Sequence, residues 1–340
     1  MIVDDRVFEE DFVPAEVVHR HEEARTLSSA LEPLLSGQRP DPTFCFGPTG
    51  VGKTCLARYT VGELRAERPD VRFAYVNCWQ DYTRFRVLHG VLEGIDRAFD
   101  VHRSTPKDEL FTRLSEADHS PIVVVLDEVD QLEETAALYD LHQLRHVSLV
   151  LIANEETTLF AALDDRVQSR LRAGTRIHFD RYGIAALVDI LGERARQGLE
   201  PGVVDEPQLR QIADAAAGDA RVAIAMLRSA ARHAERRGDE RITDETLEAA
   251  IPEARTTVRQ QTLEGLHEHQ RVLYDLIAAA GEIEPGELYA AYEDEVEDPR
   301  TTRTLRNYLS KMVHYDLVEA VGAKRGRTYR LAGEREELEA

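Results

Sequence analysis

A glycine-rich loop is the clearest chemical feature of this 340-residue sequence. It fits the pattern Gly-x-x-x-x-Gly-Lys-Ser/Thr with the residues Gly47, Pro48, Thr49, Gly50, Val51, Gly52, Lys53 and Thr54. Glycines let backbone N–H groups surround phosphate oxygens, Lys53 reaches the β- and γ-phosphates, and the Thr54 hydroxyl joins the coordination shell of Mg²⁺. The loop predicts a site for ATP or ADP with Mg²⁺, and we include the next residue, Cys55, in that site.

Two carboxylates and an amide follow later apolar runs. Asp127 and Glu128 come directly after the apolar residues 123–126, where we expect Asp127 to hold Mg²⁺ and Glu128 to polarise the attacking water as general base. Asn154 ends another apolar run and is placed to hydrogen-bond the γ-phosphate or the same water. The alternatives are a solvated acidic strand end and an asparagine that turns the chain out of the sheet.

Three arginines complete the candidate catalytic residues. Arg166 and Arg170 follow a short predicted helix, and we expect Arg170, supported by Arg166, to act as an arginine finger on an ATP bound by a neighbouring subunit. Local salt bridges are the alternative for both. Arg221 lies near the start of a predicted helix that Gly218 and Asp219 precede. We expect Arg221 to fold over the phosphates, so that closure of its domain depends on the bound nucleotide.

Five apolar runs that alternate with helical patterns must position these side chains. The runs are residues 43–46, 71–78, 122–127, 147–154 and 175–180. Their alternation predicts an α/β core with a parallel sheet covered by helices on both faces. After residue 182 the strand patterns stop and amphipathic helices follow, for example at residues 185–196 and 220–236, which predicts a small helical domain.

The C-terminal part of the chain predicts a winged helix. Helical patterns from residue 256 precede a hairpin whose strands are residues 317–321 and 327–331. We therefore expect four segments: a nucleotide-binding core with an N-terminal extension at residues 1–181, a helical lid at 182–255, a winged-helix DNA-binding domain at 256–333 and an acidic tail at 334–340.

Positive charge gathers in the predicted winged helix. Residues 299–330 contain eight basic and two acidic residues, in a chain of net charge −21. A helix predicted to begin at Thr301 suits a recognition helix that enters the major groove by its N-terminal end, with the contacts Thr301, Arg303 and Arg306. We expect the hairpin to contact DNA phosphates or an adjacent minor groove through Lys324, Arg325 and Arg327. The alternative is a winged helix that binds only protein.

The composition indicates a halophilic protein. Only four of the 42 basic residues are lysine, and acidic residues occur in every segment, as in proteins of salt-in halophiles; an ordinary acidic bacterial protein is the alternative. At molar salt the Debye length is about 3 Å, so net charge does not exclude DNA. The sequence has no run of eighteen apolar residues and no signal-peptide pattern, so we expect a cytoplasmic protein with no membrane partner.

The order and spacing of these motifs resemble those of AAA+ ATPases over residues of about 12 to 250. Within AAA+, the chain resembles the archaeal origin-recognition and cell-division-cycle initiator family. The finer match rests on the segment from Val13 to Arg20, on Val76-Asn77-Cys78 with the residues after them, and on the predicted winged helix. The resemblance implies further nucleotide contacts at Val13, His19, Arg20 and Tyr182. It also implies that a helical stretch from about Asp81 to Ile95 touches DNA through Arg84 and Arg86.

The resemblance implies a slow ATPase that works as a switch. Such a protein binds double-stranded origin DNA sequence-specifically and marks it for loading of the replicative helicase, alone or with a second initiator copy. Two other interpretations stay open. One is an ATP-switched transcription regulator, or a plasmid or mobile-element ATPase with the same domains. The other is a ring-forming clamp-loader or branch-migration ATPase.

Overall fold

The computed structural model describes residues 1–117, 120–322 and 326–332. The chain divides into two compact units, Met1–Arg255 and Thr256–Ala340. Lys324, Arg325 and the acidic tail, which the sequence analysis singled out, lie outside the described residues. None of the helices in the described segments is long and apolar enough to cross a membrane.

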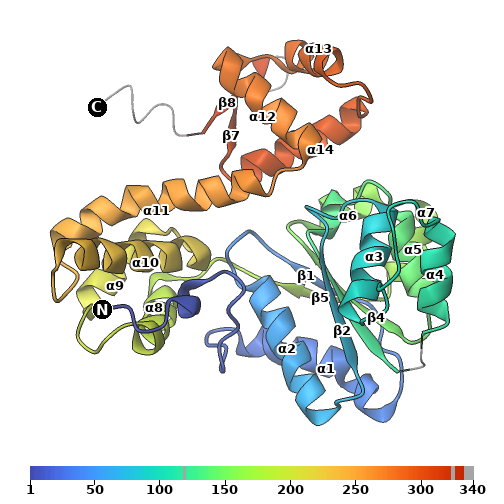
Figure 1. Cartoon of the computed structure of the whole chain (residues 1–340), viewed down its shortest axis with the longest axis horizontal. Coiled ribbons are helices and arrows are strands. Elements are labelled where there is room, and N and C mark those ends of the chain that lie inside the picture. The colour runs from blue at the N-terminus through green and yellow to red at the C-terminus, as the bar shows by residue number, and fades with distance from the viewer. Residues whose placement is uncertain (118–119, 323–325, 333–340) are drawn as a thin grey trace. The chain divides into compact units, whose positions relative to one another are not determined.

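A five-stranded parallel sheet lies between two layers of helices in the first unit (Figure 1). In spatial order its strands are β2 (Arg72–Asn77), β3 (Ile122–Asp127), β4 (Val147–Ala153), β1 (Thr43–Phe46) and β5 (Thr175–His178). All five predicted strands are present, with ends that differ by at most two residues. Every residue of β1, β3 and β4 is buried, as expected for apolar strands with both faces covered. Because β1 lies between β4 and β5, the loop after β1 lies at the carboxyl edge of the sheet, between the loops that follow these two strands.

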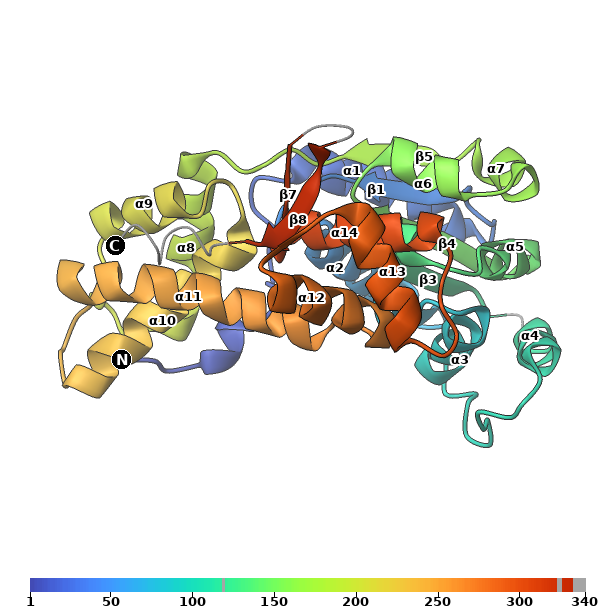
Figure 2. The ribbon, with the colours of Figure 1, turned by 90° about the horizontal axis from the view of Figure 1, so that it is seen from above.

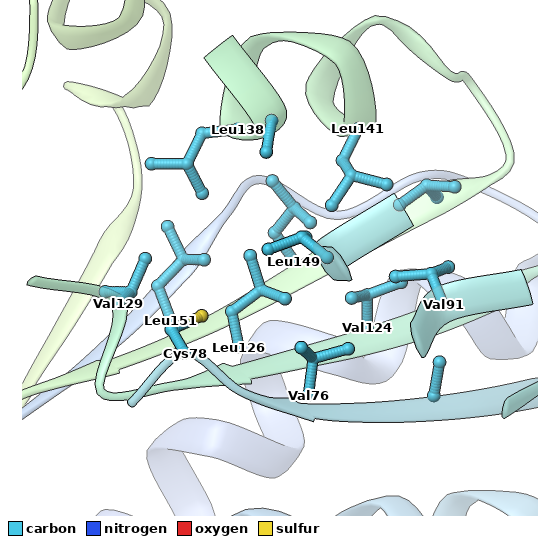
Figure 3. Close-up of a cluster of buried hydrophobic side chains, with 14 of the residues drawn as sticks. Val76, Cys78, Val91, Val124, Leu126, Val129, Leu138, Leu141, Leu149 and Leu151 are labelled. Carbon is cyan, nitrogen blue, oxygen red and sulfur yellow. The ribbon is translucent and has the colours of Figure 1, made fainter. Parts of the chain in front are cut away.

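Two layers of helices cover the two faces of this sheet. One face packs on α1 (His21–Leu31), η2 (Glu32–Ser36) and α2 (Lys53–Glu67), and it includes Val123 and Val125 of β3. The other face packs on α3 (Arg84–Gly94), α4 (Lys107–Ser115), η3 (Val129–Gln131), α5 (Ala136–Gln143), α6 (Glu156–Ala162) and α7 (Asp165–Leu171). Figure 3 shows Leu126 and Leu151 on this second face, below Leu138 of α5. Since strand residues alternate between faces, Asp127 shares the α2 face with Val123 and Val125.

The helical lid has a core of its own within the first unit. It consists of α8 (Ile184–Gly198), α9 (Glu206–Ala215), α10 (Ala220–Arg237) and the beginning of α11 (Asp244–Glu264), which contributes Leu247, Ala250 and Ala254. The capping box of Asp205 and Gln208 fixes the start of α9, and Asp219 caps α10. The predicted helices of the lid are therefore confirmed at residues 185–196 and 220–236.

The first residues of the chain pack on the lid, although the sequence analysis grouped them with the core. The short helix η1 (Asp5–Phe8) places Phe8 in the lid core, and Arg194 of α8 donates to the carbonyl of Val7 at 2.7 Å. Gly198 allows the close approach, because a Cβ there would lie 2.5 Å from the ring of Phe8. Asp5 forms ion pairs with Arg228 and Arg232 of α10. These contacts are made between residues about 200 apart in sequence, which no local pattern reveals.

The second unit combines three helices with a three-stranded antiparallel sheet (Figure 2). Its elements after α11 are α12 (Glu268–Ala280), β6 (Glu282–Ile283), α13 (Pro285–Glu295), α14 (Thr302–His314), β7 (Val318–Val321) and β8 (Thr328–Leu331). The hairpin of β7 and β8 and the helix α14 are where the sequence predicts them. Thr301 caps α14, whose buried face contains Leu305, Leu309 and Met312. The strand β6 could not be predicted from the sequence, because a two-residue strand has no periodicity and is defined only by its pairing with Arg330 and Tyr329.

Candidate nucleotide and DNA sites

The glycine-rich loop connects β1 to the N-terminus of α2. Gly50 and Gly52 have φ of +71° and +87°, which glycine adopts without strain. The helix begins at Lys53, and no side chain caps it. Its first-turn N–H groups and the positive end of its dipole are thus directed at the space above the loop, as phosphate binding requires. Val51 is fully buried in the core on the α2 side, so its side chain packs behind the loop.

Lys53 is buried in the loop and points at its carbonyls. Its Nζ donates hydrogen bonds of 2.6 Å to the carbonyl oxygens of Gly47 and Pro48, and lies 3.5 Å from Oδ1 of Asn154. Burial lowers the pKa of Lys53 to about 8, while the charge of Asp127 opposes that shift. A phosphate placed above the loop would give this ammonium group a far better partner than two neutral carbonyls.

Thr54 and Asp127 form a ready site for a divalent cation. The Thr54 hydroxyl donates to Oδ2 of Asp127 at 2.5 Å, and the backbone N–H of Glu128 donates to Oδ1 of Asp127 at 2.9 Å. A carboxylate and a hydroxyl oxygen are ligands that suit Mg²⁺, which commonly binds one or two carboxylates together with substrate phosphates. The residues present therefore fit a Mg²⁺ ion that accompanies a nucleotide.

Glu128 and Asn154 border the same space. Glu128 is nearly buried and has a left-handed backbone with φ of +54°, a conformation that costs energy in a residue other than glycine and that often marks a functional position. The Nδ2 atom of Asn154 is buried and has no hydrogen-bond partner among the described residues. A buried unsatisfied donor is unfavourable by about 1–3 kcal/mol, and a phosphate oxygen or a water would satisfy it. Both residues thus lie where the sequence analysis expects them.

The lid touches the glycine-rich loop directly. The N–H of Ala220, the first residue of α10, donates to the carbonyl of Gly50 at 2.9 Å. A Cβ on Gly50 would lie 2.0 Å from Oδ1 of Asp219, so only glycine allows this approach. Arg221 is the next residue of α10, and its guanidinium lies 3.9 Å from a carboxylate oxygen of Glu10. The start of α10, including Arg221, is therefore beside the loop.

The other expected nucleotide contacts lie around the connection from β5 to the lid. The Arg20 guanidinium stacks 4.1 Å from the ring centroid of Tyr182 and donates to the carbonyl of Asp180 at 2.5 Å. Tyr182 also approaches the loop, because a Cβ on Gly52 would lie 2.7 Å from its hydroxyl. His19 pairs with Asp189 of α8 at 2.7 Å, and Val13 is exposed. Arg20 thus stabilises the connection from β5 to the lid through its contacts with Asp180 and Tyr182.

Arg166 and Arg170 lie on the exposed side of α7. Both guanidinium groups cover the ring of Tyr139 on α5, at 5.0 and 4.6 Å from its centroid. Arg170 also donates to the carbonyl of Arg166 at 3.1 Å. Among the described residues, the contacts of both arginines are with Tyr139 and with the Arg166 carbonyl, so their role at a neighbouring subunit stays a prediction.

The two arginines expected to touch DNA from α3 differ in their surroundings. The Arg84 guanidinium pairs with Asp140 at 2.5 Å and with Asp108 at 3.2 Å, which raises the pKa of Arg84 against the effect of burial. Its side chain is thereby directed to carboxylates of α4 and α5. Arg86 pairs with Asp81 at 3.3 Å and remains half exposed. Arg86 is the better placed of the two for a partner outside the chain.

The expected DNA contacts of the second unit differ in their surroundings from several basic residues near them. Arg300 pairs with Asp298, Arg330 pairs with Glu319, and Lys311 is buried beside Tyr315. Those that are exposed among the expected DNA contacts are Thr301, Arg303, Arg306 and Arg327. The first three lie in the first turns of α14 and its cap, and Arg327 directly precedes β8.

Two residues at the nucleotide site escaped the sequence analysis. Tyr75 donates to Oδ2 of Asp127 at 3.0 Å, and Asp130 is partly buried near Lys53, with burial raising the pKa of Asp130. Alternation along β2 places Phe73, Tyr75 and Asn77 on one face, so the available signal for Tyr75 was its polar tip on the same face as the polar Asn77. Asp130 follows Glu128 closely, but its burial could not be inferred from spacing.

Comparisons with known proteins agree with this architecture. The family model of an AAA domain matches residues 37–160, and that of the Cdc6 AAA+ ATPase-type lid domain matches residues 188–252. The ORC1-type DNA replication protein 9 of Halobacterium salinarum is 47% identical over 97% of this chain and 94% of its own length. The ORC1-type DNA replication protein 1 of the same organism is 46% identical over 90% of this chain and 100% of its own length.

A solved structure extends the similarity to three dimensions. The ORC1 protein of Aeropyrum pernix, determined in complex with DNA, superposes with a TM-score of 0.74 at 29% identity. The superposition covers 98% of this chain and 94% of that one, so it includes the second unit.

Proposed function

Because the chain belongs to the ORC1-type DNA replication proteins, a family with halophilic archaeal members, we propose that it is an ATP-switched replication initiator that binds origin DNA sequence-specifically. The single observation that carries the ATP part is the hydrogen bond from Thr54 to Asp127 beside the unsatisfied Asn154 amide. The DNA part rests on the exposed arginines of the second unit and on the Aeropyrum pernix relative, which was solved with DNA.

The site residues divide the work of ATP hydrolysis. Backbone N–H groups of the loop and Lys53 would hold the phosphates, while Thr54 and Asp127 would hold Mg²⁺, which would neutralise charge on the β- and γ-phosphates. Glu128 accepts a proton from the attacking water, and the Asn154 amide orients that water or the γ-phosphate. Catalysis here depends on positioning and charge, as in other phosphoryl transfers.

Slow turnover fits a switch better than a motor. The start of α10 contacts Gly50 of the loop, so the lid is positioned to respond to a nucleotide that binds there. Arg221, beside that contact, would then reach the phosphates from the lid. Each nucleotide state thereby favours its own lid position, since a ligand shifts an equilibrium by its difference in affinity for the two states.

We further propose the partners that an initiator requires. Arg303 and Arg306 read bases, Thr301 and the hairpin residues hold phosphates, and Arg86 supports the complex from α3. The bound protein marks the origin for the replicative helicase in the cytoplasm. If a second copy binds next to the first on DNA, Arg170 of one copy contacts the ATP bound by the other.

Nuclease footprinting tests this function. The full chain with ATP and Mg²⁺, at molar salt, is expected to protect repeated inverted sequences in noncoding DNA near its gene. Protection confined to a promoter would support a transcription regulator. Ring formation with rapid ATP hydrolysis on any duplex would support a clamp-loader or branch-migration ATPase.

A further inference from the structure

A tyrosine on the neighbouring strand contacts the carboxylate of the magnesium site. The register of β2 and β3 pairs Tyr75 with Val125 and Asn77 with Asp127. Residues two apart on a strand share a face, so Tyr75 and Asp127 are diagonal neighbours on the α2 side, within reach of a long aromatic side chain. The phenol O–H donates to Oδ2 of Asp127 at 3.0 Å.

This contact completes the set of donors around Asp127. Oδ2 accepts from Thr54 and Tyr75, and Oδ1 accepts from the backbone of Glu128. The Thr54 hydroxyl is itself expected to bind the Mg²⁺ ion, and the donor of Glu128 is its backbone N–H group. Tyr75 is therefore a side chain that restrains the carboxylate without being a candidate ligand.

The guanidinium group of Arg58 stacks on the ring of Tyr75. Its guanidinium carbon lies 4.0 Å from the ring centroid of Tyr75, and Arg58 belongs to α2, the helix that begins in the glycine-rich loop. The phenol O–H is the donor in the bond to Asp127, because a carboxylate oxygen only accepts. The chain Arg58, Tyr75, Asp127 links this helix to the end of β3.

We propose that Tyr75 is a positioning residue for Mg²⁺, which acts by fixing the orientation of Asp127 beside Thr54. The proposal rests on the proposed function, because it presupposes that a nucleotide and Mg²⁺ bind at this loop. Tyr75 touches neither the nucleotide nor the ion. Outer-shell groups that orient metal ligands typically change metal affinity by about 10–100-fold when removed.

The test compares Tyr75→Phe, which removes only the hydroxyl, with Tyr59→Phe, which removes a partly exposed phenol from α2. The affinity for a fluorescent ATP analogue is measured across a Mg²⁺ titration and again in EDTA. For Tyr75→Phe we expect the Mg²⁺ concentration at half-saturation to rise about tenfold, with the affinity in EDTA unchanged. Tyr59→Phe should match the wild type in both measurements.

Three results would overturn the proposal. The first is an unchanged Mg²⁺ titration for Tyr75→Phe. The second is an equal loss of affinity with Mg²⁺ and in EDTA, which indicates general damage to the loop. If Tyr75→Phe does not fold, Arg58→Met, which leaves the hydroxyl but removes its support, should shift the Mg²⁺ midpoint upward, and no shift is the third result.

The wild type separates this proposal from the proposed function. If the wild type binds no nucleotide under any condition, the proposed function fails and Tyr75 has no ion to position. If the wild type binds in a Mg²⁺-dependent way and Tyr75→Phe behaves identically, only the positioning role fails.

Discussion

The Thr54 hydroxyl donates a hydrogen bond of 2.5 Å to Oδ2 of Asp127, a residue 73 positions later in the chain. The bond joins the helix after β1 to the end of β3, and β4 alone separates these strands in the sheet. Asn154, directly after β4, comes within 3.5 Å of Lys53. The order of the strands therefore assembles the nucleotide site, and each of its residues has a distinct consequence when changed.

Replacing Lys53 should abolish tight nucleotide binding. Lys53→Ala removes the ammonium group that we expect at the β- and γ-phosphates, and charged hydrogen bonds contribute about 1.5–3 kcal/mol each, so the affinity should fall by about 100-fold. Fluorescence titration with an ATP analogue measures this loss. Lys107→Ala, which removes a surface ion pair with Glu134, is the matched control and should bind normally.

Glu128→Gln should separate binding from hydrolysis. The amide preserves the shape of the side chain but cannot accept the proton of water, so hydrolysis should fall about 10²–10⁴-fold while ATP affinity stays within a few fold. Single-turnover phosphate release and a binding titration measure the two quantities. Glu116→Gln, at an exposed carboxylate, should leave both unchanged. Normal hydrolysis by Glu128→Gln would remove Glu128 as the base.

Nucleotide binding should take up protons in mildly alkaline solution. The pKa of Lys53 is about 8 in the free protein, so at a pH of about 8.5 the amine is mostly neutral. Phosphates favour the charged form and raise that pKa, so binding draws in a fraction of a proton, and affinity weakens as pH rises further. Calorimetry in buffers of different ionisation enthalpy measures the uptake. Lys53→Arg, charged throughout this range, should show none; the absence of uptake in the wild type would contradict the shifted pKa.

Arg170 should matter only when chains associate. Arg170→Ala should leave ATP binding by a single chain unchanged, because its contacts are with Tyr139 and the Arg166 carbonyl. If it acts as an arginine finger, any rise of hydrolysis with protein concentration should be lost, by up to about 10³-fold. Arg172→Ala, two residues away and also exposed, is the control. A concentration-dependent rate that Arg170→Ala retains would argue for local roles alone.

Two arginines of the second unit should affect DNA binding differently. Arg327→Ala should weaken binding to all duplexes alike and reduce the salt slope by about 1, as expected for a phosphate contact. Arg306→Ala, in the exposed first turns of α14, should cost about 1–3 kcal/mol and relax the preference at one base pair. Arg330→Ala, which removes an ion pair with Glu319, serves as the control. Competition among sequence variants at molar salt distinguishes these results.

The strands and the nucleotide site could be predicted because their signals are local. Buried parallel strands are continuous apolar runs, and phosphate chemistry fixes the residue types after β1, β3 and β4. The structure accordingly has β1 and β3 with the predicted ends. The order of the same motifs indicates the AAA+ fold, and the helical pattern after residue 182 predicts a small helical domain, which the model of the Cdc6-type lid matches.

Contacts over long sequence distances could not be predicted. The DNA contact of Arg84 stays a prediction, and its carboxylate partners Asp108 and Asp140, which come from two later helices, could not be inferred. Arg20 was expected at the nucleotide, and its stacking on Tyr182 depends on the path of the chain after β5. Tyr75 was visible as a polar tip on the partly buried edge strand β2, but its partner Asp127 is defined only by the register of β2 and β3.

The central claim, that this chain is an ATP-controlled replication initiator, is tested most directly by plasmid replication. A plasmid without another origin carries the gene and the noncoding DNA that the protein protects, and its copy number is measured in a host that lacks the gene. The wild-type gene should maintain the plasmid, and the Lys53→Ala gene should not. Equal copy number with both genes, or no replication with the wild-type gene, would contradict the claim.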